Sequence, residues 1–229
     1  MLKSLAERAL DLLFPRRCVG CGTEGGFLCS SCLASVKSLS MPWCVHCGRP
    51  WRESGLCTDC RVRPRHLAGI RAAFRYEGPV REAILQFKYH GVSAMADELA
   101  GPLQNLLAEH PLAFDVIVPV PLAPDRLRER GYNQAEALAR RLGKALDKPV
   151  VPGLVRTRST RAQALLRSWE ERYNNVAGAF RADPALVTGR RILVVDDVCT
   201  TGATLESCGE ALKAAGATTA WGLALAREV

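Results

Sequence analysis

Four Cys-x-x-Cys pairs in the first 60 residues constrain this chain more than any other feature. They form two modules, with seven residues between the pairs of the first and nine between those of the second. Two thiols so close in sequence are suited to share a metal ion rather than to cross-link distant parts of a fold. The pattern favours zinc in a reducing compartment, the cytoplasm, over a secreted protein with disulfide bonds. The eight predicted ligands are Cys18, Cys21, Cys29, Cys32, Cys44, Cys47, Cys57 and Cys60.

Each module offers four thiolates, the ligand set of a tetrahedral structural Zn²⁺ site with no open position. Gly22 and Gly48 each follow a pair directly, where a tight knuckle turns backbone N–H groups toward sulfur. Iron–sulfur clusters or redox dithiols are the alternatives. Sequential pairing within each module needs only short hairpins and is preferred over an interleaved arrangement. With four sulfurs at hand, His46 is expected to be a surface residue rather than a ligand.

The cysteine-rich composition ends near residue 66, which predicts an N-terminal helix and double zinc ribbon over 1–66 and a second domain over 67–229. Apolar residues at helical spacing in 1–17 predict a packing helix rather than a signal peptide. Beyond residue 66, strand and helix patterns alternate, which is typical of an α/β fold with a mostly parallel sheet and flanking helices on both faces. The expected strands cover 69–76, 114–120, 148–151, 190–197 and 219–226, and the expected helices 79–89, 93–110 (with a break allowed at Pro102), 133–147 and 202–216.

The formal net charge of +8 is concentrated in one region. Residues 126–172 hold twelve Lys and Arg against five Asp and Glu. Such a concentration indicates an anionic ligand, either small or polymeric. The chain has no run of eighteen apolar residues, so no membrane insertion is expected.

The stretch VVDDVCTTGAT, residues 194–204, joins a predicted strand to a predicted helix. A turn at this junction offers unpaired N–H groups and the positive end of the helix dipole, which attract a phosphate. Threonine hydroxyls add donors, and Gly202 lets the backbone approach closely. A simple strand-to-helix turn is the alternative, but it gives no reason for the paired acids Asp196 and Asp197.

This stretch resembles the phosphoribosyl pyrophosphate (PRPP) signature of type I phosphoribosyltransferases. The resemblance implies that the loop holds the 5′-phosphate, whereas Asp196 and Asp197, as catalytic residues, accept hydrogen bonds from the ribose hydroxyls. Their charge would favour positive charge developing at the anomeric carbon. Mg²⁺ would accompany PRPP. The PRPP-binding residues implied here are Val198, Cys199, Thr200, Thr201, Gly202, Ala203 and Thr204.

A second half of the site is expected after the strand over 114–120. In the resembled enzymes the turn after this strand binds pyrophosphate, and the role carries to Val120, Pro121, Leu122 and Arg126. Arginines that merely solvate a surface are the alternative. The long basic connection that follows, with Arg156, Arg158, Arg161 and Arg167, predicts a flap over a phosphate-rich ligand, and Arg161 is placed among the PRPP contacts. Lys88 is a further candidate phosphate contact, or simply a cation at a helix end.

The double cysteine module followed by FKYHG, VPVPL, RERGYNQ and VVDDVCTTGAT resembles the ComF family of bacterial competence proteins over nearly the whole chain. The resemblance implies a phosphoribosyltransferase-like protein that serves DNA uptake or nucleotide metabolism, with a competence helicase as a partner. No acceptor substrate is identified, so whether the chain is an enzyme stays open. The alternative is a non-catalytic PRPP sensor that binds single-stranded DNA, with Trp43 and Trp51 as candidates for base stacking.

Overall fold

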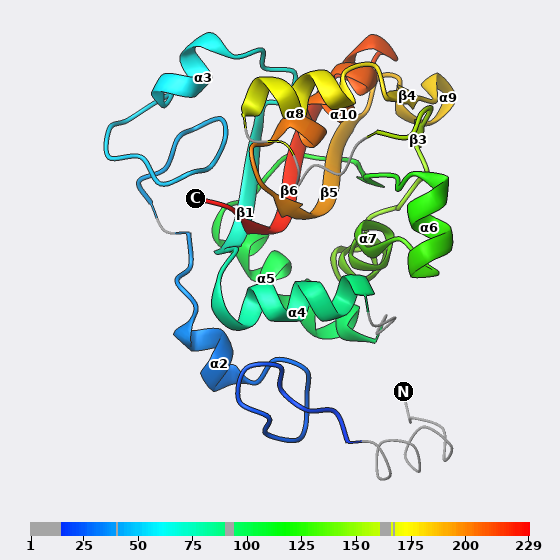
Figure 1. The fold of residues 1–229 in the computed structure, drawn as a ribbon. Helices are drawn as coiled ribbons and strands as arrows, with labels where there is room; N and C mark the ends of the chain where they lie inside the picture. Colours follow the sequence, from blue (N-terminus) through cyan, green and yellow to red (C-terminus); the bar gives the residue numbers. More distant parts are fainter. Residues whose placement is uncertain (1–14, 40, 90–93, 161–165, 167) are drawn as a thin grey trace.

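The protein is built around a four-stranded parallel sheet (Figure 1). The computed structural model describes residues 15–39, 41–89, 94–160, 166 and 168–229. The strand order is β1-β6-β5-β2, and all three neighbouring pairs are parallel. The predicted α/β fold class is confirmed. The strands are β1 (Gly69–Arg75), β2 (Val116–Pro119), β5 (Arg191–Cys199) and β6 (Thr219–Arg227).

One face of this sheet is covered by α4 (Gly78–Tyr89), α5 (Met95–Glu109) and α7 (Gln134–Leu146). Their apolar sides form one core with every second residue of β5, among them Leu193 and Val195. Pro102 lies inside α5 and does not end it, since the buried side of that helix continues from Leu99 to Leu103 and beyond. The break allowed at this proline is therefore absent.

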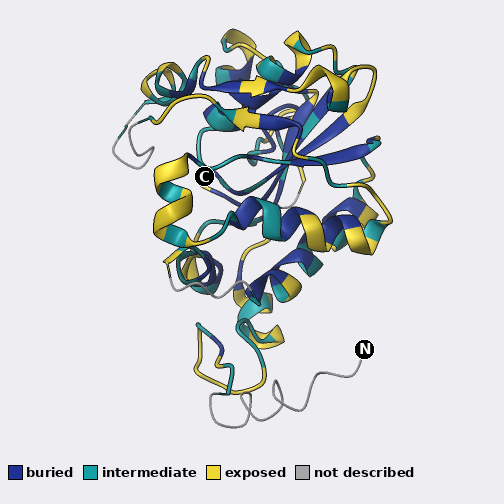
Figure 2. Ribbon diagram, turned by 90° about the vertical axis from the view of Figure 1, so that its right-hand side faces the viewer, coloured by how far each residue is buried: buried dark blue, intermediate teal, exposed yellow. Residues whose placement is uncertain are grey.

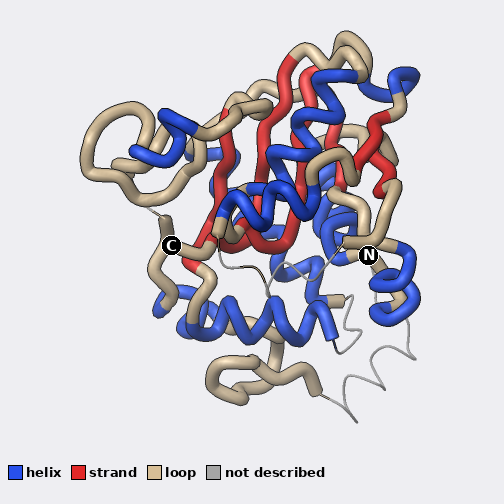
Figure 3. The backbone as a smooth tube through the Cα atoms, turned by 45° about the horizontal axis from the view of Figure 1, so that its top comes forward, coloured by secondary structure: helices blue, strands red, loops and turns tan. Residues whose placement is uncertain are grey.

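The opposite face of the sheet carries α8 (Trp169–Val176) and α10 (Ala203–Ala214), together with the short α9 (Pro184–Val187). A two-stranded antiparallel sheet of β3 (Leu154–Arg156) and β4 (Phe180–Ala182) completes this layer. The alternate residues of β5, Ile192 and Val194, belong to the core on this side. Figure 2 shows the strands buried between the two layers, and Figure 3 shows helices on both sides of them.

The strand expected over 148–151 is wrong. Only an isolated parallel bridge joins Val150 to Ile117. The Ile117 N–H donates to the Pro149 carbonyl, and the Val151 N–H donates to the Ile117 carbonyl. Pro149 has no N–H to contribute, and Asp147 ends α7 in a left-handed conformation just before it, so only a short extended contact remains. The sheet therefore ends at β2.

Strand β5 extends two residues further than the pattern predicted, to Cys199. Helix α10 starts at Ala203, so the connection between them shrinks to residues 200–202, named here the 200–202 turn. The other predicted strands and helices beyond residue 66 are present, with ends shifted by a few residues. The predicted N-terminal helix falls almost entirely outside the described residues.

The two cysteine modules lie against different parts of the α/β body, the first near α4 and the second near β1 (Figure 1). The first ribbon, residues 18–32, includes the start of α2 (Ser30–Ser35) and docks on α5. There Glu98 accepts hydrogen bonds from the N–H groups of Phe27 and Leu28, at 2.8 and 3.1 Å. The second ribbon, residues 44–60, leads into α3 (Thr58–Val62) and packs against β1 through the bond from Ile70 N–H to the His46 carbonyl, at 2.6 Å.

Candidate functional site

The eight cysteines form two clusters, each from one sequential module, and in each cluster the sulfur atoms lie within 4.8 Å of one another. The distance from Cys21 Sγ to Cys29 Sγ is 3.6 Å, and that from Cys47 Sγ to Cys57 Sγ is 3.8 Å. A tetrahedron with Zn–S bonds of about 2.3 Å has edges of about 3.8 Å, so both clusters fit a tetrathiolate zinc ion. The grouping is the sequential one that the spacing favoured.

Backbone geometry at the knuckles agrees with this ligand set. Gly22 and Gly48 have φ angles of +75° and +70°, which L side chains rarely adopt. The Cys57 N–H points at Cys44 Sγ at 3.3 Å, as the Cys29 N–H does at Cys18 Sγ at 3.4 Å. Such N–H···S contacts stabilise the thiolate form that binds zinc.

The 200–202 turn lies where the sequence placed it, between the carboxyl end of β5 and the N-terminus of α10. Gly202 is the N-cap with φ +87°, and a Cβ there would meet Ile70 Cδ1 at 3.1 Å. The turn surrounds a concavity of about 20 Å³, to which Asp196 contributes one wall. Because the first N–H groups of α10 have no helical acceptor, this concavity suits an anion. Its lining comprises Asp196, Val198, Cys199, Thr200, Thr201, Gly202, Ala203, Thr204 and Leu205.

The acid pair is divided between the two faces of β5. Successive residues of a strand point to opposite sides, so Asp196 shares the side of Ile192 and Val194, beneath α10. Asp197 shares the opposite side, where Lys88 Nζ donates to its Oδ1 at 2.8 Å. Asp197 is 7% exposed. The two carboxylates therefore line different walls at the carboxyl end of the same strand.

The buried charges around the acid pair shift the pKa values of Asp196 and Lys88. Burial, reinforced by the charge of Asp197, raises the pKa of Asp196 to about 7, although Lys88 and Arg156 act against this shift. Burial alone would lower the pKa of Lys88, but attraction to Asp197 and a hydrogen bond with it raise that pKa. Lys88 is therefore the buried cation that pairs with Asp197, a role that the sequence analysis did not assign.

The predicted second half of the site lies next to β5, because β2 pairs with it. The Val120 N–H donates to the Val195 carbonyl at 2.9 Å, which holds the turn after β2 against the strand that carries the acids. Pro121 and Leu122 continue this turn, half-buried. Arg126 lies further away on α6 (Pro124–Arg130), where it pairs with Glu129 on the surface at 2.6 Å.

The two ends of the basic connection between β3 and β4 lie against each other, and the Thr157 N–H donates to the Ala179 carbonyl at 2.8 Å. Arg158 donates to the Ala177 carbonyl at 2.8 Å, and the guanidinium of Arg156 lies 5.4 Å from the centre of the Phe180 ring. Arg161 and Arg167 lie outside the described residues, so the predicted flap stays a prediction.

The RERGYNQ motif supplies structural residues that the sequence analysis did not assign. Tyr132 Oη and Gln134 Nε2 both donate to the Phe87 carbonyl, next to Lys88 on α4. Asn133 donates to the Val120 carbonyl at 2.9 Å and caps α7 through the Ala135 N–H. The sequence signal that could have indicated these roles is the pair of side-chain amides, Asn133 and Gln134, at the start of a strongly amphipathic helix. Their bonds tie the end of α4 to the turn after β2.

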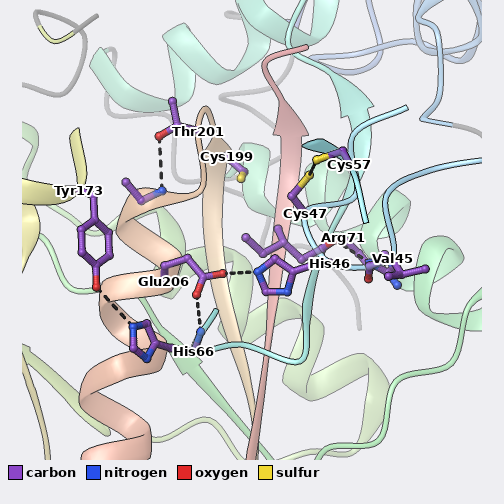
Figure 4. Close-up of polar contacts among 12 residues, drawn as sticks. Val45, His46, Cys47, Cys57, His66, Arg71, Tyr173, Cys199, Thr201 and Glu206 are labelled. Atoms are coloured by element: carbon purple, nitrogen blue, oxygen red, sulfur yellow. Dashed lines mark hydrogen bonds and ion pairs between the residues drawn. The ribbon is translucent and has the colours of Figure 1, made fainter. Parts of the chain in front are cut away.

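His46 is the clearest correction to the sequence analysis. It is 6% exposed rather than a surface residue, and its Nε2 lies 2.8 Å from Glu206 Oε1 on α10 (Figure 4). Glu206 and Arg227 are also buried, at 3% and 1% exposure. No local pattern marks these three residues, because each one's partner lies far away in the sequence.

Comparison with known proteins gives two family matches in chain order. The family model described as double zinc ribbon domain matches residues 9–61, and that described as phosphoribosyl transferase domain matches residues 91–225. Among the described residues, no helix has the length and apolar character needed to cross a membrane.

Curated relatives match along most of the chain. Competence protein ComFC of Bacillus subtilis (strain 168) is 30% identical over 212 residues, which cover 90% of this chain and 82% of the relative. Competence protein F of Haemophilus influenzae is 32% identical over 229 residues, covering 93% and 98%. DNA utilization protein YhgH of Shigella flexneri is 32% identical over 202 residues, covering 84% and 86%. Each similarity covers 84% or more of this chain, so none is confined to the α/β body of residues 67–229.

Proposed function

The chain belongs to the ComF family of competence proteins, and from this premise we propose that it binds PRPP at the carboxyl ends of β2 and β5. The observation that carries the proposal is the concavity shared by the 200–202 turn and Asp196. Backbone N–H groups there bind the 5′-phosphate, while Asp196 and Asp197 accept hydrogen bonds from the ribose hydroxyls. The turn at Val120, Pro121 and Leu122 holds the pyrophosphate.

Basic side chains complete the proposed site. Lys88 lies beside Asp197 and offers its ammonium to ligand phosphate. Arg126 on α6 is a further candidate phosphate contact, and so is Arg161, which lies outside the described residues. The acid pair and phosphate together provide the oxygen ligands that Mg²⁺ prefers, and a bound Mg²⁺ would neutralise part of the diphosphate charge. The acids then favour positive charge at the anomeric carbon as pyrophosphate leaves.

The proposed activity is phosphoribosyl transfer in the cytoplasm, and it is tested in two steps. Calorimetry with PRPP and Mg²⁺ should show binding that the double variant Asp196→Ala/Asp197→Ala abolishes while zinc content stays at two ions per chain. The matched control is Glu109→Ala, an exposed acid at the end of α5. Pyrophosphate release with a panel of bases and amines then identifies an acceptor. Unchanged affinity in the double variant would remove the acids from the site.

A second candidate function is a non-catalytic PRPP sensor that binds single-stranded DNA, with a competence helicase as its partner. The names of relatives, competence protein and DNA utilization protein, support it. Trp43 and Trp51 are poorly suited to base stacking, since Trp43 packs edge-on against His110 and Trp51 against the cysteines of the second ribbon. A further aromatic candidate is Trp169, which is itself stacked on Tyr173 with ring centres 4.7 Å apart.

Arg63 lies over that Trp169 ring at 5.0 Å and adds a cation to the surface. Oligonucleotide binding measured across salt concentration tests this second function, because phosphate contacts make affinity fall steeply with salt. Trp169→Ala should weaken binding more than Trp51→Ala does. Binding that ignores salt, or PRPP turnover with an identified acceptor and no oligonucleotide binding, would reject this candidate.

A further inference from the structure

The second ribbon reaches the 200–202 turn through buried contacts, whereas the first ribbon docks on α5 away from it. One small cavity, about 20 Å³, is lined both by zinc-ligand cysteines and by residues of the turn. The ribbon side contributes His46, Cys47 and Cys60 to this lining, and the turn side contributes Thr201 and Gly202. The second cysteine cluster and the 200–202 turn therefore line the same cavity.

The end of the turn is held by Glu206. This residue lies in the first turn of α10, where its N–H donates to the Gly202 carbonyl at 2.9 Å. Its carboxylate is bound on both oxygens: Oε1 to His46 Nε2 at 2.8 Å, and Oε2 to the His66 N–H at 2.7 Å (Figure 4). His46 lies between two zinc-ligand cysteines, so the ribbon fixes the N-terminus of the helix that supplies the N–H donors.

The start of the turn is held by Arg227. Its Nη1 donates to Cys199 Sγ at 2.9 Å, and the next residue, Glu228, donates its N–H to the Cys199 carbonyl at 3.0 Å. Arg227 is 1% exposed, and within the described part of the chain its Nε and Nη2 have no hydrogen-bond partner. A buried guanidinium needs an anion nearby. A zinc ion bound by the four thiolates of the second cluster would carry a net charge of −2 and would supply that anion.

Ile70 provides a third connection. The His46 carbonyl accepts its N–H at 2.6 Å, and a Cβ at Gly48 would meet its carbonyl oxygen at 2.4 Å, so the ribbon backbone lies directly on β1. Ile70 Cδ1 in turn lies beside Gly202, 3.1 Å from where a Cβ would stand. The second ribbon therefore packs on β1, and β1 packs on the 200–202 turn, with no room for an added methyl group at Gly48 or Gly202.

We propose that the second ribbon clamps the 200–202 turn in its anion-binding shape, with His46, Glu206 and Arg227 as positioning residues. Zinc binding at the second ribbon and sugar-phosphate binding at the turn are then energetically linked. Linkage is reciprocal, so each ligand strengthens the binding of the other. The link to sugar-phosphate binding rests on the proposed function, whereas the clamp rests on the contacts of His46, Glu206, Arg227 and Ile70.

Hydrogen exchange on the full chain tests the clamp without any ligand. His46→Ala should speed exchange of the amides at 200–206 by about tenfold, because the anchor of Glu206 is lost. His46→Gln keeps a hydrogen-bonding group and should restore most of the protection. Glu98→Ala, the matched control, should loosen the first ribbon and leave 200–206 unchanged. Protection at 200–206 that is equal in wild type and His46→Ala, with zinc retained, overturns the proposal.

Zinc release from the unaltered protein gives a second measurement. It does not require the His46→Ala variant, so it tests the proposal even if that variant does not fold. A chromogenic chelator should remove zinc in two phases, and Glu98→Ala identifies the phase of the first ribbon by accelerating it. Saturating ribose 5-phosphate should slow the other phase several-fold. Bound ribose 5-phosphate with both phases unchanged overturns the linkage. If ribose 5-phosphate does not bind wild type while His46→Ala still speeds exchange, the proposed function fails and the clamp stands.

Discussion

Lys88 on α4 and Asp197 on β5 form a buried ion pair with 2.8 Å between Nζ and Oδ1. Their side chains are only 17% and 10% exposed. The pair joins a helix of one layer to the strand that carries the candidate sugar-binding acids. The surroundings of the two acids differ, since Asp197 has a buried cation beside it and Asp196 faces the 200–202 turn.

Removing the cation of this pair should be costly. Lys88→Met leaves the buried Asp197 carboxylate without its cation, so the free energy of unfolding in urea should fall by about 3 kcal/mol. The double variant Lys88→Met/Asp197→Asn should recover much of that loss. The matched control is Arg141→Met, which breaks an exposed pair with Asp97 and should change stability by about 0.5 kcal/mol or less. A loss in Lys88→Met no larger than in the control contradicts this prediction.

Asp196 should make stability depend on pH. Its pKa is raised from 3.8 to about 7 by burial and by Asp197, so the folded chain holds this proton more tightly than the unfolded chain. The stabilising contribution is complete below about pH 4 and is lost as pH rises toward 7. Asp196→Asn has no carboxyl group to ionise, so its stability should not fall over this pH range. Its free energy of unfolding should exceed that of wild type by on the order of 2–4 kcal/mol at pH 8 and should be nearly equal to it at pH 4. Parallel stability curves for the two proteins between pH 4 and pH 8 would refute the shift.

The backbone at Gly202 should tolerate no side chain. Gly202→Ala combines a φ of +87° with a Cβ 3.1 Å from Ile70 Cδ1, and should cost about 2 kcal/mol by chemical denaturation. Gly131→Ala is the matched control, with φ +77° and no atom within 4 Å of the added Cβ. It isolates the backbone strain, about 1 kcal/mol. Equal losses in the two variants would mean that the contact with Ile70 does not matter.

The two knuckle glycines should differ in sensitivity. Both have positive φ, but a Cβ at Gly48 would lie 2.4 Å from the Ile70 carbonyl oxygen, whereas nothing lies within 4 Å of one at Gly22. Gly48→Ala must push the second ribbon away from β1, so it should lower the melting temperature and speed zinc loss from that ribbon. Gly22→Ala should show only the smaller effect of strain. Similar zinc-loss rates in the two variants would argue against tight docking of the second ribbon.

Features set by neighbours in the chain were predictable. The sequential cysteine clusters follow from spacing, since a two-residue gap brings both thiols to one ion. The junction of β5 with α10 follows from the change of hydrophobic period beside Gly202. The strand expected over 148–151 was wrong because whether a short apolar run becomes a strand depends on the partner beside it, and Pro149 limits that pairing. The roles of the site residues and the boundary near residue 66 stay predictions.

The sequence alone determined two zinc ligand sets and a parallel α/β sheet with an anion-suited turn, because metal-ligand spacing and hydrophobic period act over a few residues. Only the tertiary structure decided that Asp197 meets Lys88 and that His46 meets Glu206 across 160 positions of chain. Strand order and the docking of the ribbons select those partners. Both depend on packing between distant segments, for which no local pattern in the sequence carries a signal.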